Sequence, residues 1–483
     1  MSAPAAAVAA GVAAPVLCVD LDGTLIRTDL LLESLVLLIK ENPFALVRLP
    51  FWLLRGKATL KAEIAARVTL EPAALPYNKE FVSWLEAERR AGRSLWLCTA
   101  ANEELARRVA AHLGLFDGVL ASDTATNLVG SAKASLLEQR FGARNFDYCG
   151  NEPRDLAIWE KARGAIVVQG NSRLEKAAAQ HAPVLQTFPD RGNKLRAVLR
   201  ALRPHQWAKN VLILMPLLAA HRATELPLVG TALLAMVAFC LCASSVYLLN
   251  DLLDLEADRA HPHKSKRPFA AGDLSILAGL ALAPALLVTG ALLAAWLPAK
   301  FQLVFATYYV LTLGYSFFLK GRVLLDALAL AGLYTLRVIA GAAAVSVPLS
   351  FWLLLFSVFL FLSLAFVKRF AELDGLRRQQ RLRAAGRGYY VEDLPMLQSL
   401  GSASGYLSVL VLALYINSPD IQALYSRPKA IWLLCVLMLY WVSRVWMQAS
   451  RGLMHDDPVV FALKDRVSVG IGVLSAITVF VSV

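Results

Sequence analysis

The sequence is poor in charged residues. They make up 18% of the 483 residues, whereas hydrophobic residues make up 57% and the mean hydropathy is +0.54. Soluble globular domains carry about 25% charged residues, so the composition excludes an ordinary soluble protein. A polytopic membrane portion is the first expectation, and the length leaves room for two or three domains.

Cysteine and acidic residues are also scarce. The six cysteines form no CxxC pair and have no neighbouring histidines, which argues against both a disulfide framework and a zinc site. Asp and Glu number 36 against 49 Lys and Arg, which gives a net charge of +13. We attribute this excess to contact with anionic lipid, to loops on the inner side of a membrane and to phosphorylated substrates, rather than to nucleic acid.

The chain changes character near Gly192. Before it, apolar runs are short and interrupted by charges, as in a soluble α/β domain. Four of these runs end in polar residues and alternate with helical stretches such as NEELARRVAAHLG; they are PVLCVDLDGT, RSLWLCTA, FDYCG and GAIVVQG. This alternation predicts a Rossmann-like parallel sheet in residues 1–192, with functional groups at the carboxyl ends of its strands.

Long apolar runs fill residues 193–483 and predict an all-α transmembrane bundle. Several reach the ~20 residues that a bilayer requires, although the first and the seventh are short. The nine expected helices lie near Trp207–Ala220, Leu228–Leu249, Leu274–Leu297, Phe301–Leu319, Leu324–Val345, Phe351–Val367, Leu407–Ile416, Ala430–Trp446 and Val467–Val483.

Lysine and arginine are unevenly distributed among the loops of this bundle. The loops after the second, fourth, sixth and eighth helices are rich in them, whereas alternate loops such as VSVPLS are poor. Because basic loops stay on the cytoplasmic side, we expect a multi-pass protein of the inner (cytoplasmic) membrane with a cytoplasmic N-terminal domain.

An acidic cluster follows the second expected helix, in the segment NDLLDLEADRAHPHKSKRP. Carboxylates this close repel one another unless a cation neutralises them, and hard oxygen ligands suit Mg²⁺. Mg²⁺ commonly bridges to substrate phosphates, which Lys264 and Arg267 would help to hold. A solvated, capped helix end is the alternative interpretation. Three of the candidate ligands recur every four residues on one helical face, with Asp251 about a turn away; the three are Asn250, Asp254 and Asp258.

This segment fits the NDxxDxxxDxxxPxKxxRP signature of UbiA-type intramembrane prenyltransferases, and the resemblance extends from about Arg200 to the C-terminus. It implies a bundle of nine membrane spans with Mg²⁺ and a pyrophosphate substrate at the cytoplasmic side. Mg²⁺ held by Asp254 and Asp258, together with Asn250 or Asp251, would neutralise the leaving pyrophosphate.

Further segments resemble decaprenyl-phosphate phosphoribosyltransferases: LRPHQWAKN, YSFFLKGRVLLD and LRVIAGA. That branch implies phosphoribosyl pyrophosphate as donor and a polyprenyl phosphate as acceptor. The second aspartate motif of aromatic prenyltransferases is not evident after the sixth helix, where VKRFAEL and GYYVEDL stand instead, and this disfavours an aromatic acceptor. The substrate-binding candidates in this half are Lys209, Asn250, Lys264, Arg267, Tyr315, Lys320, Arg337, Lys368 and Arg369.

Two groups of charges leave alternatives open. Arg337 is an intramembrane cation and thus a functional candidate by default, or else a structural partner of Asp326 in the same helix. The segment RGLMHDDPVVFALKDR offers metal ligands or, as we prefer, forms a solvated cytoplasmic loop; its candidates are His455, Asp456, Asp457 and Asp465.

The N-terminal half resembles haloacid-dehalogenase-like phosphatases through VDLDGTL, in which Asp20 would attack phosphorus and Asp22 would act as acid and base. The remaining motifs follow in order. The resemblance implies that Thr99 and Lys133 contact the phosphoryl oxygens, and that Mg²⁺ is held by the two motif acids with Asp155 and Asn151. An asparagine at position 151 replaces the usual acid, which leaves a degenerate regulatory domain as an alternative.

Residues 28–85 occupy the place of a helical cap in that family. The stretch FALVRLPFWLLRGK is apolar with cations interspersed. It forms either the core of the cap or a segment that rests on a membrane surface.

These patterns predict a bifunctional, Mg²⁺-dependent membrane enzyme. Its bundle would transfer 5-phosphoribose to a polyprenyl (decaprenyl) phosphate, and its soluble domain would remove the 5-phosphate of the product, for cell-wall glycan synthesis. An aromatic polyprenyltransferase of the 4-hydroxybenzoate type and a non-catalytic scaffold are the rival interpretations. Assembly into oligomers is compatible with the sequence.

Overall fold

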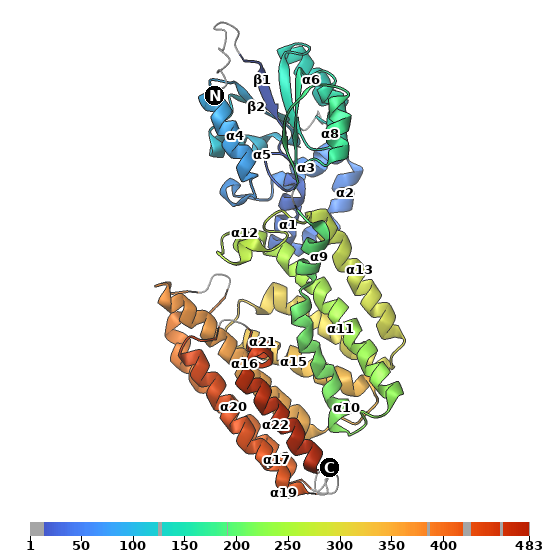
Figure 1. Ribbon diagram of the computed structural model, residues 1–483, viewed down its shortest axis with the longest axis vertical. Helices are drawn as coiled ribbons and strands as arrows, with labels where there is room; N and C mark the ends of the chain where they lie inside the picture. Colours follow the sequence, from blue (N-terminus) through green and yellow to red (C-terminus); the bar gives the residue numbers. More distant parts are fainter. Residues whose placement is uncertain are drawn as a thin grey trace, which may run out of the picture. The chain divides into compact units, whose positions relative to one another are not determined.

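The computed structural model describes residues 14–123, 128–190, 192–383, 387–418, 427–454 and 457–482 (Figure 1). The chain divides into two compact units by its internal contacts. The first combines residues 1–201 with residues 248–281, and the second combines residues 202–247 with residues 282–483. The acidic segment therefore packs with the N-terminal domain.

A six-stranded parallel sheet forms the centre of the first unit, in the order β3-β2-β1-β4-β5-β6. This is the order of a Rossmann-like sheet, as predicted. Four strands coincide with the four runs identified in the sequence, whereas the two edge strands β3 and β6 were not anticipated. The strands are β1 (Val16–Val19), β2 (Leu95–Asn102), β3 (Gly118–Ser122), β4 (Phe146–Gly150), β5 (Gly164–Val168) and β6 (Val184–Phe188).

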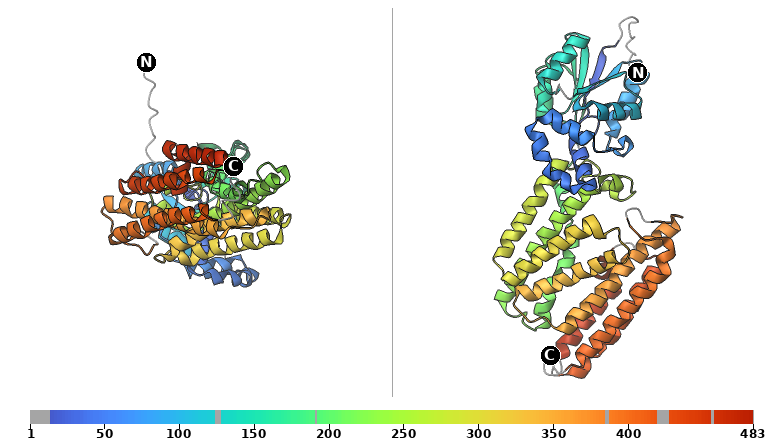
Figure 2. Two further views of the ribbon diagram at one scale, coloured as in Figure 1. Left: turned by 90° about the horizontal axis from the view of Figure 1, so that it is seen from below. Right: turned by 180° about the vertical axis from the view of Figure 1, so that it is seen from behind.

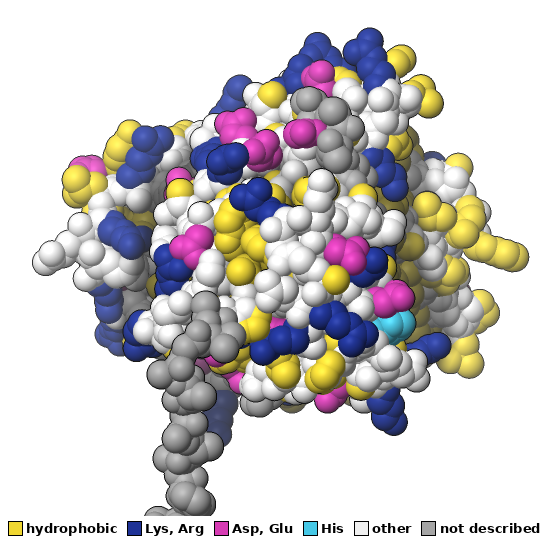
Figure 3. All heavy atoms as spheres, turned by 90° about the horizontal axis from the view of Figure 1, so that it is seen from above, with side chains coloured by type: hydrophobic (Ala, Val, Ile, Leu, Met, Phe, Trp, Pro, Cys, Tyr) yellow, Lys and Arg dark blue, Asp and Glu magenta, His cyan; other side chains and the backbone are white. Residues whose placement is uncertain are grey.

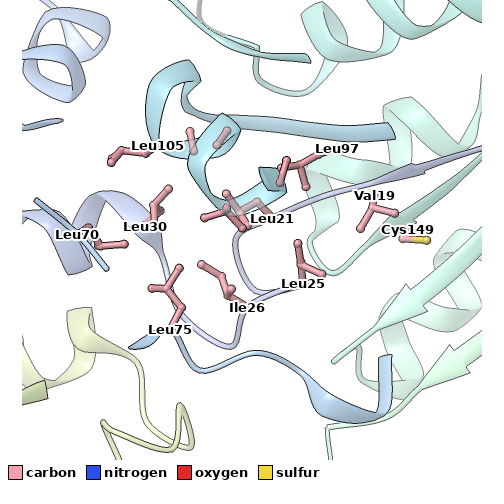
Figure 4. Packing of buried hydrophobic residues seen from close by; sticks show 14 of the residues in the cluster. Val19, Leu21, Leu25, Ile26, Leu30, Leu70, Leu75, Leu97, Leu105 and Cys149 are labelled. Atoms are coloured by element: carbon pink, nitrogen blue, oxygen red, sulfur yellow. The ribbon is translucent and has the colours of Figure 1, made fainter. Parts of the chain in front are cut away.

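Alternate residues of β1 face opposite sides of the sheet, which creates two hydrophobic cores. Leu17 and Val19 belong to a core shared with the cap and two helices (Figure 4), whereas Cys18 belongs to a second core on the other face. The first face is covered by α4 (Lys79–Arg90) and α5 (Glu103–Leu113). The second is covered by α6 (Ser131–Phe141), α7 (Leu156–Trp159) and α8 (Ser172–Ala179).

The expected cap segment is helical. It contains α1 (Leu30–Glu41), the 3₁₀ turns η1 (Pro43–Val47) and η2 (Pro72–Ala74), and α2 (Leu49–Leu54) and α3 (Lys57–Ala65). Trp52 of α2 is buried in the same core as β1 and is covered by the Arg67 guanidinium, 4.8 Å from the ring centroid.

The acidic segment is attached to this cap inside the first unit. Arg259 donates to both carboxylate oxygens of Glu33 in α1, at 2.6 and 3.1 Å, and both side chains are buried. Gly272, with φ +72°, lies so close to Arg27 that a Cβ there would contact the Arg27 backbone. A salt bridge of 3.6 Å joins Arg27 to Asp273. The cap, through Glu33, and the preceding residue Arg27 thus contact the acidic segment and its continuation at two places.

The second unit is all helical (Figure 2). In its described residues, seven helices are long and apolar enough to cross a membrane, or eight if the bent pair α21–α22 counts as one span. The first of the nine expected helices is the 3₁₀ helix η4 (Pro204–Leu214) followed by the short α10 (Met215–Ala219). The remaining eight are α11 (Leu226–Leu253), α13 (Ile276–Ala295), α14 (Ala299–Gly314) with the π-turn η6 (Tyr315–Leu319), α15 (Leu325–Ala344), α16 (Phe351–Arg378), α17 (Leu394–Ile416), α20 (Leu433–Ser450) preceded by α19 (Pro428–Ile431), and α21 (Pro458–Lys464) with α22 (Arg466–Ser482).

Two helices are longer than the sequence suggested. The prediction ended one helix at Val367, but α16 continues to Arg378 because Lys368 and Arg369 pair with carboxylates and do not terminate it. The next helix, α17, begins at Leu394, whereas the prediction began it at Leu407. A Cβ at Gly401 would overlap Trp446, so this glycine allows α17 to approach α20 closely.

Candidate active sites

The motif acids of the N-terminal domain, Asp20 and Asp22, stand at the carboxyl end of β1, as expected. The backbone N–H of Asp20 donates to Cys149 of β4 at 3.1 Å, which fixes the loop against the neighbouring strand. Lys133 of α6 donates to Asp20 Oδ1 at 2.9 Å. Asp22 accepts a 2.8 Å hydrogen bond from the backbone N–H of Leu30, at the start of the cap helix α1. Asp20 is thus bonded to the core domain, and Asp22 to the cap.

Asp155 joins the same group through a tyrosine that the sequence analysis missed. The hydroxyl of Tyr148 accepts from Lys133 at 3.0 Å and donates to Asp155 Oδ1 at 3.2 Å. Two backbone N–H groups, those of Asn151 and Glu152, hold the other oxygen of Asp155 at 2.9 Å. Because Tyr148 lies inside an apolar strand, its pattern indicated packing and not a polar role.

Asn151 and Thr99 make hydrogen bonds with residues next to the site. Asn151 Oδ1 accepts from Thr24 at 3.2 Å, and a Cβ at Gly23, where φ is +70°, would overlap its side-chain amide. The Thr99 hydroxyl is buried and accepts from the Ala101 backbone at 3.0 Å. The amide of Asn151 therefore packs against the Asp20–Thr24 loop, where a second acid would add to the repulsion between carboxylates.

A cavity of 290 Å³ opens in front of these residues. Asp20, Asp22, Lys133 and Asp155 line it, and the cap adds cations that the sequence analysis did not single out. Lys61 reaches from the cap to the core domain and donates to the Ala100 carbonyl at 2.7 Å. Lys57 is a second cation from the cap in this wall, and Arg154 is a further cation from the core domain.

The acids of this cavity crowd one another. Burial and the neighbouring Asp29 carboxylate raise the pKa of Asp22 well above its usual range. Burial, followed by the Asp20 carboxylate, raises the pKa of Asp155 to about 6, although Lys133 opposes the shift. Oxygen ligands that repel one another in a buried cavity suit a small hard cation, so these residues fit Mg²⁺.

The acidic segment of the second predicted site lies at the end of α11. Asp254 is the N-cap of the short helix α12 (Leu255–Arg259), so the chain bends there instead of continuing as one helix. One guanidinium nitrogen of Arg267 lies 3.2 Å from Asp251 and 2.6 Å from Asp258, whose side chains are both buried. Asn250 and Asp254 are half-buried, and Lys264 of η5 (Lys264–Lys266) is exposed.

Asp251 and Asp258 thus converge on a single cationic atom. Among the described residues, no group of three or more His, Cys, Asp or Glu is placed to hold a metal by itself. Two carboxylates nevertheless fit Mg²⁺, because this ion usually binds one or two protein carboxylates and completes its shell with water and substrate phosphates.

In the second unit, a polar cluster surrounds Asp457 at the start of α21. Lys209 of η4 and Lys368 of α16 donate to Asp457 Oδ2 at 2.7 and 3.2 Å, and Tyr334 of α15 donates to Oδ1 at 3.1 Å. Burial would raise the pKa of Asp457, but the two lysines lower it below its usual range. We call Lys209, Tyr334, Lys368 and Asp457 the Asp457 cluster.

The Asp457 cluster corrects the interpretation of RGLMHDDPVVFALKDR as a solvated loop. Asp457 is mostly buried and fully paired, and Asp465 bonds to Arg444 and to the backbone of Ser468 at the start of α22. Their spacing alone gave no sign of these partners, because the lysines come from helices far away in the sequence. His455 and Asp456 lie outside the described residues.

Arg337 lies next to this cluster and not next to Asp326, so the predicted alternative of an Arg337–Asp326 pair is wrong. Arg337 donates to Asn210 at 2.9 Å and to the Tyr308 hydroxyl at 2.8 Å, and its guanidinium lies 5.3 Å from the Tyr334 ring centroid. Asp326 and Arg337 are eleven positions apart on α15, which places them about 16 Å apart along the helix axis.

Asp326 belongs to a separate buried group. Arg369 of α16 pairs with Asp326 and with Glu372, and it donates to the Tyr315 hydroxyl at 3.0 Å. Tyr389, from the GYYVEDL segment, donates its hydroxyl to Asp326. Arg369 and Tyr315 are therefore engaged in joining helices, whereas Lys320 is a half-buried residue beyond η6.

The fold and these sites define a multi-pass membrane enzyme joined to an α/β domain of the hydrolase type. A model of the UbiA prenyltransferase family matches residues 211–457, and a model of haloacid dehalogenase-like hydrolases matches residues 17–159. The chain belongs to the UbiA prenyltransferase family and carries a haloacid dehalogenase-like domain at its N-terminus.

Three relatives show how the two parts are combined. The uncharacterized protein y4nM of Sinorhizobium fredii is 37% identical over 96% of this chain and 90% of its own length. The nodulation protein NoeC of Azorhizobium caulinodans is 37% identical over 55% of this chain and 86% of its own length. The decaprenyl-phosphate phosphoribosyltransferase of Mycolicibacterium smegmatis is 33% identical over 57% of this chain and 88% of its own length.

Proposed function

We propose that the transmembrane part transfers 5-phosphoribose from phosphoribosyl pyrophosphate to a polyprenyl phosphate. The observation that carries this proposal is the surplus of cations around Asp457. Lys209 and Lys368 bond the one carboxylate, Arg337 lies against Tyr334 of the same cluster, and Lys209 and Arg337 are buried. Buried charges need partners, so a substrate with several negative charges would complete this site. The M. smegmatis relative is named a decaprenyl-phosphate phosphoribosyltransferase, which supports this proposal.

The reaction needs a neutralised leaving group. An oxygen of the lipid phosphate forms a bond to C1 of the ribose, while the bond from C1 to pyrophosphate breaks and the electron pair leaves with the pyrophosphate. Mg²⁺, when bound to Asp254 and Asp258 with Asn250 or Asp251, supplies positive charge at that pyrophosphate. Lys264 and Arg267 follow in the same segment and would bind its oxygens. Lys209 and Lys368 would orient the acceptor phosphate.

We propose that the donor pyrophosphate and the acceptor lipid phosphate both react on the cytoplasmic side of the membrane. We also propose that the boundary between the two domains lies near Gly192. The basic loops support this orientation, because Lys and Arg favour the cytoplasmic side of membrane spans. Phosphoribosyl pyrophosphate would then reach the site without crossing the bilayer.

The test is transfer of label from phosphoribosyl pyrophosphate to decaprenyl phosphate by the purified full-length protein in detergent with Mg²⁺. We expect a labelled lipid, and a loss on the order of 100-fold or more in Asp254→Ala, because an electrostatic stabiliser of the leaving group is removed. Glu225→Gln, an exposed acid just before the other end of α11, is the matched control and should keep full activity.

The same assay decides against the aromatic alternative. A protein that yields no labelled lipid, but joins a polyprenyl diphosphate to 4-hydroxybenzoate, would contradict the phosphoribosyltransferase proposal. The pairing of Glu372 of α16 with Arg369 and Arg387 disfavours this alternative, because the protein's own arginines already neutralise this carboxylate.

For the N-terminal domain we propose a phosphatase that removes the 5-phosphate of the lipid-linked product. Asp20 would attack phosphorus while Asp22 protonates the departing sugar oxygen, and water would then hydrolyse the phospho-aspartate with Asp22 as base. Lys133 would hold the phosphoryl oxygens, and the 2.9 Å distance of its amine from Asp20 supports this role. Lys57, Lys61 and Arg154 would bind a second negative group, such as the phosphate that links the sugar to the lipid.

A further inference from the structure

The cap of the N-terminal domain exposes an apolar surface that neither proposed reaction uses. Six large hydrophobic side chains of η1 and α2 face outward within eleven residues; they are Phe44, Leu46, Val47, Phe51, Leu53 and Leu54, which we call the α2 surface. Phe44 is 81% and Leu54 is 85% exposed. Scattered exposed residues are normal on soluble domains, but a contiguous patch marks a contact with another apolar phase.

The α2 surface is not the side of these elements that packs against the core of the cap. Trp52 already provides the inward anchor of α2, and Ala45 provides that of η1. Leu49 also packs partly against the core, whereas the six side chains of the α2 surface are exposed.

The charges around this surface select an anionic partner. Arg48, Arg55 and Lys57 are exposed within or beside it, and the sequence holds no Asp or Glu between Glu41 and Glu63. Acidic and basic side chains are interspersed on the face drawn in Figure 3. An apolar strip with only cations beside it is the pattern of segments that lie in the interface of an anionic membrane.

A bilayer is also within reach of this unit. The unit contains the last residues of α11 and the first residues of α13, both candidate membrane spans. The buried Arg259–Glu33 pair connects the segment between these spans to the cap helix α1, which directly precedes η1. We propose that the α2 surface rests in the head-group region of the anionic bilayer that the chain itself spans.

This contact has a consequence for the phosphatase cavity. Helix α3 follows α2 after Arg55 and Gly56 and supplies Lys57 and Lys61 to the cavity wall. A cap anchored at the lipid surface would hold the cavity beside head groups, where a lipid-linked sugar phosphate is found. The inference does not depend on either proposed reaction, because it concerns only the position of the cap.

The test uses the full chain in vesicles that contain anionic lipid and nitroxide-labelled lipid. A fluorophore is attached to single cysteines introduced at Phe44 or Leu54, and at Glu175, an exposed position on α8 of the same unit. The six native cysteines are buried, so wild-type protein treated in the same way gives the background. We expect the fluorophores at 44 and 54 to be quenched several-fold more strongly than the one at 175.

Three results separate the outcomes. Quenching that weakens in the Arg48→Gln, Arg55→Gln double variant, or in neutral vesicles, supports the anionic bilayer as partner. Equal, weak quenching at all three positions would overturn the proposal. Weak quenching together with cross-linking between copies through a cysteine at position 44 would assign the α2 surface to a second copy of the chain instead.

Discussion

Arg337 shows how a single residue combines structural and chemical constraints. Its guanidinium is buried in α15, bonds Asn210 and Tyr308, and lies over the ring of Tyr334, whose hydroxyl bonds Asp457. Arginine suits this position because its planar group donates in several directions at once and stays charged when it is buried. The residue thus links η4, α14 and α15 at the edge of the Asp457 cluster.

We expect Arg337→Lys to lower kcat/KM for transfer by about 10- to 100-fold, because hydrogen bonds to charged groups contribute about 1.5–3 kcal/mol each. Lysine keeps the positive charge, but its ammonium group cannot donate to Asn210 and Tyr308 at the same time, as the guanidinium does. The measurement is steady-state transfer with both substrates varied. Arg377→Lys, an exposed residue of α16, is the control. Equal kinetics in both variants would show that the two bonds do not position the site.

At the scale of the elements, the close packing of η4 against α15 depends on a glycine of α15. A Cβ at Gly341 would overlap the carbonyl oxygen of Ile213, so this glycine permits η4 to lie against α15. The contact sets the position of Lys209 and Asn210, which reach the Asp457 cluster and Arg337 from η4.

We therefore expect Gly341→Ala to displace η4, to lower stability by about 1–3 kcal/mol as overpacking does, and to reduce transfer. Gly332→Ala on the same helix is the matched control, since the nearest atom to its added Cβ is Leu311, at an ordinary 3.9 Å. Thermal unfolding in detergent and the transfer assay would be compared for the two. A Gly341→Ala protein as stable and active as Gly332→Ala would contradict this account.

At the scale of the whole molecule, we propose that the transferase and hydrolase-type domains carry out consecutive reactions. The S. fredii relative, aligned over 96% of the chain, supports their combination, whereas the alignments with the A. caulinodans and M. smegmatis relatives cover 55% and 57% of the chain. Transfer releases pyrophosphate, whereas removal of the 5-phosphate releases inorganic phosphate. The two products therefore report on the two sites independently.

We expect Asp20→Asn to reduce release of inorganic phosphate from the lipid-linked product on the order of 1,000-fold or more, because the nucleophile is lost. Formation of labelled lipid should be unchanged. Asp190→Asn, an exposed acid of the same domain, should affect neither product. Phosphate release that survives Asp20→Asn would refute the proposed phosphatase, and it would favour a regulatory domain.

The fold class followed from local patterns. Short apolar strands between helices indicated a parallel sheet, and long apolar runs indicated membrane helices, because both patterns arise from the solvent that surrounds each segment. The edge strands β3 and β6 escaped notice because they are only partly buried, whereas β4 and β5 are fully buried. The ends of α16 and α17 were misplaced because charges and glycines there meet partners from other helices.

The sequence by itself thus determined the two kinds of domain, the order of the motif acids and the excess of basic residues, all of which are encoded by neighbouring residues. Only the tertiary structure decided that Asp457 faces Lys209 and Lys368, that Tyr148 bridges Lys133 and Asp155, and that Asp326 pairs with Arg369. These pairs join residues distant in the chain. Their energy depends on burial and on an approach within hydrogen-bond distance, and only the packing of whole elements sets both.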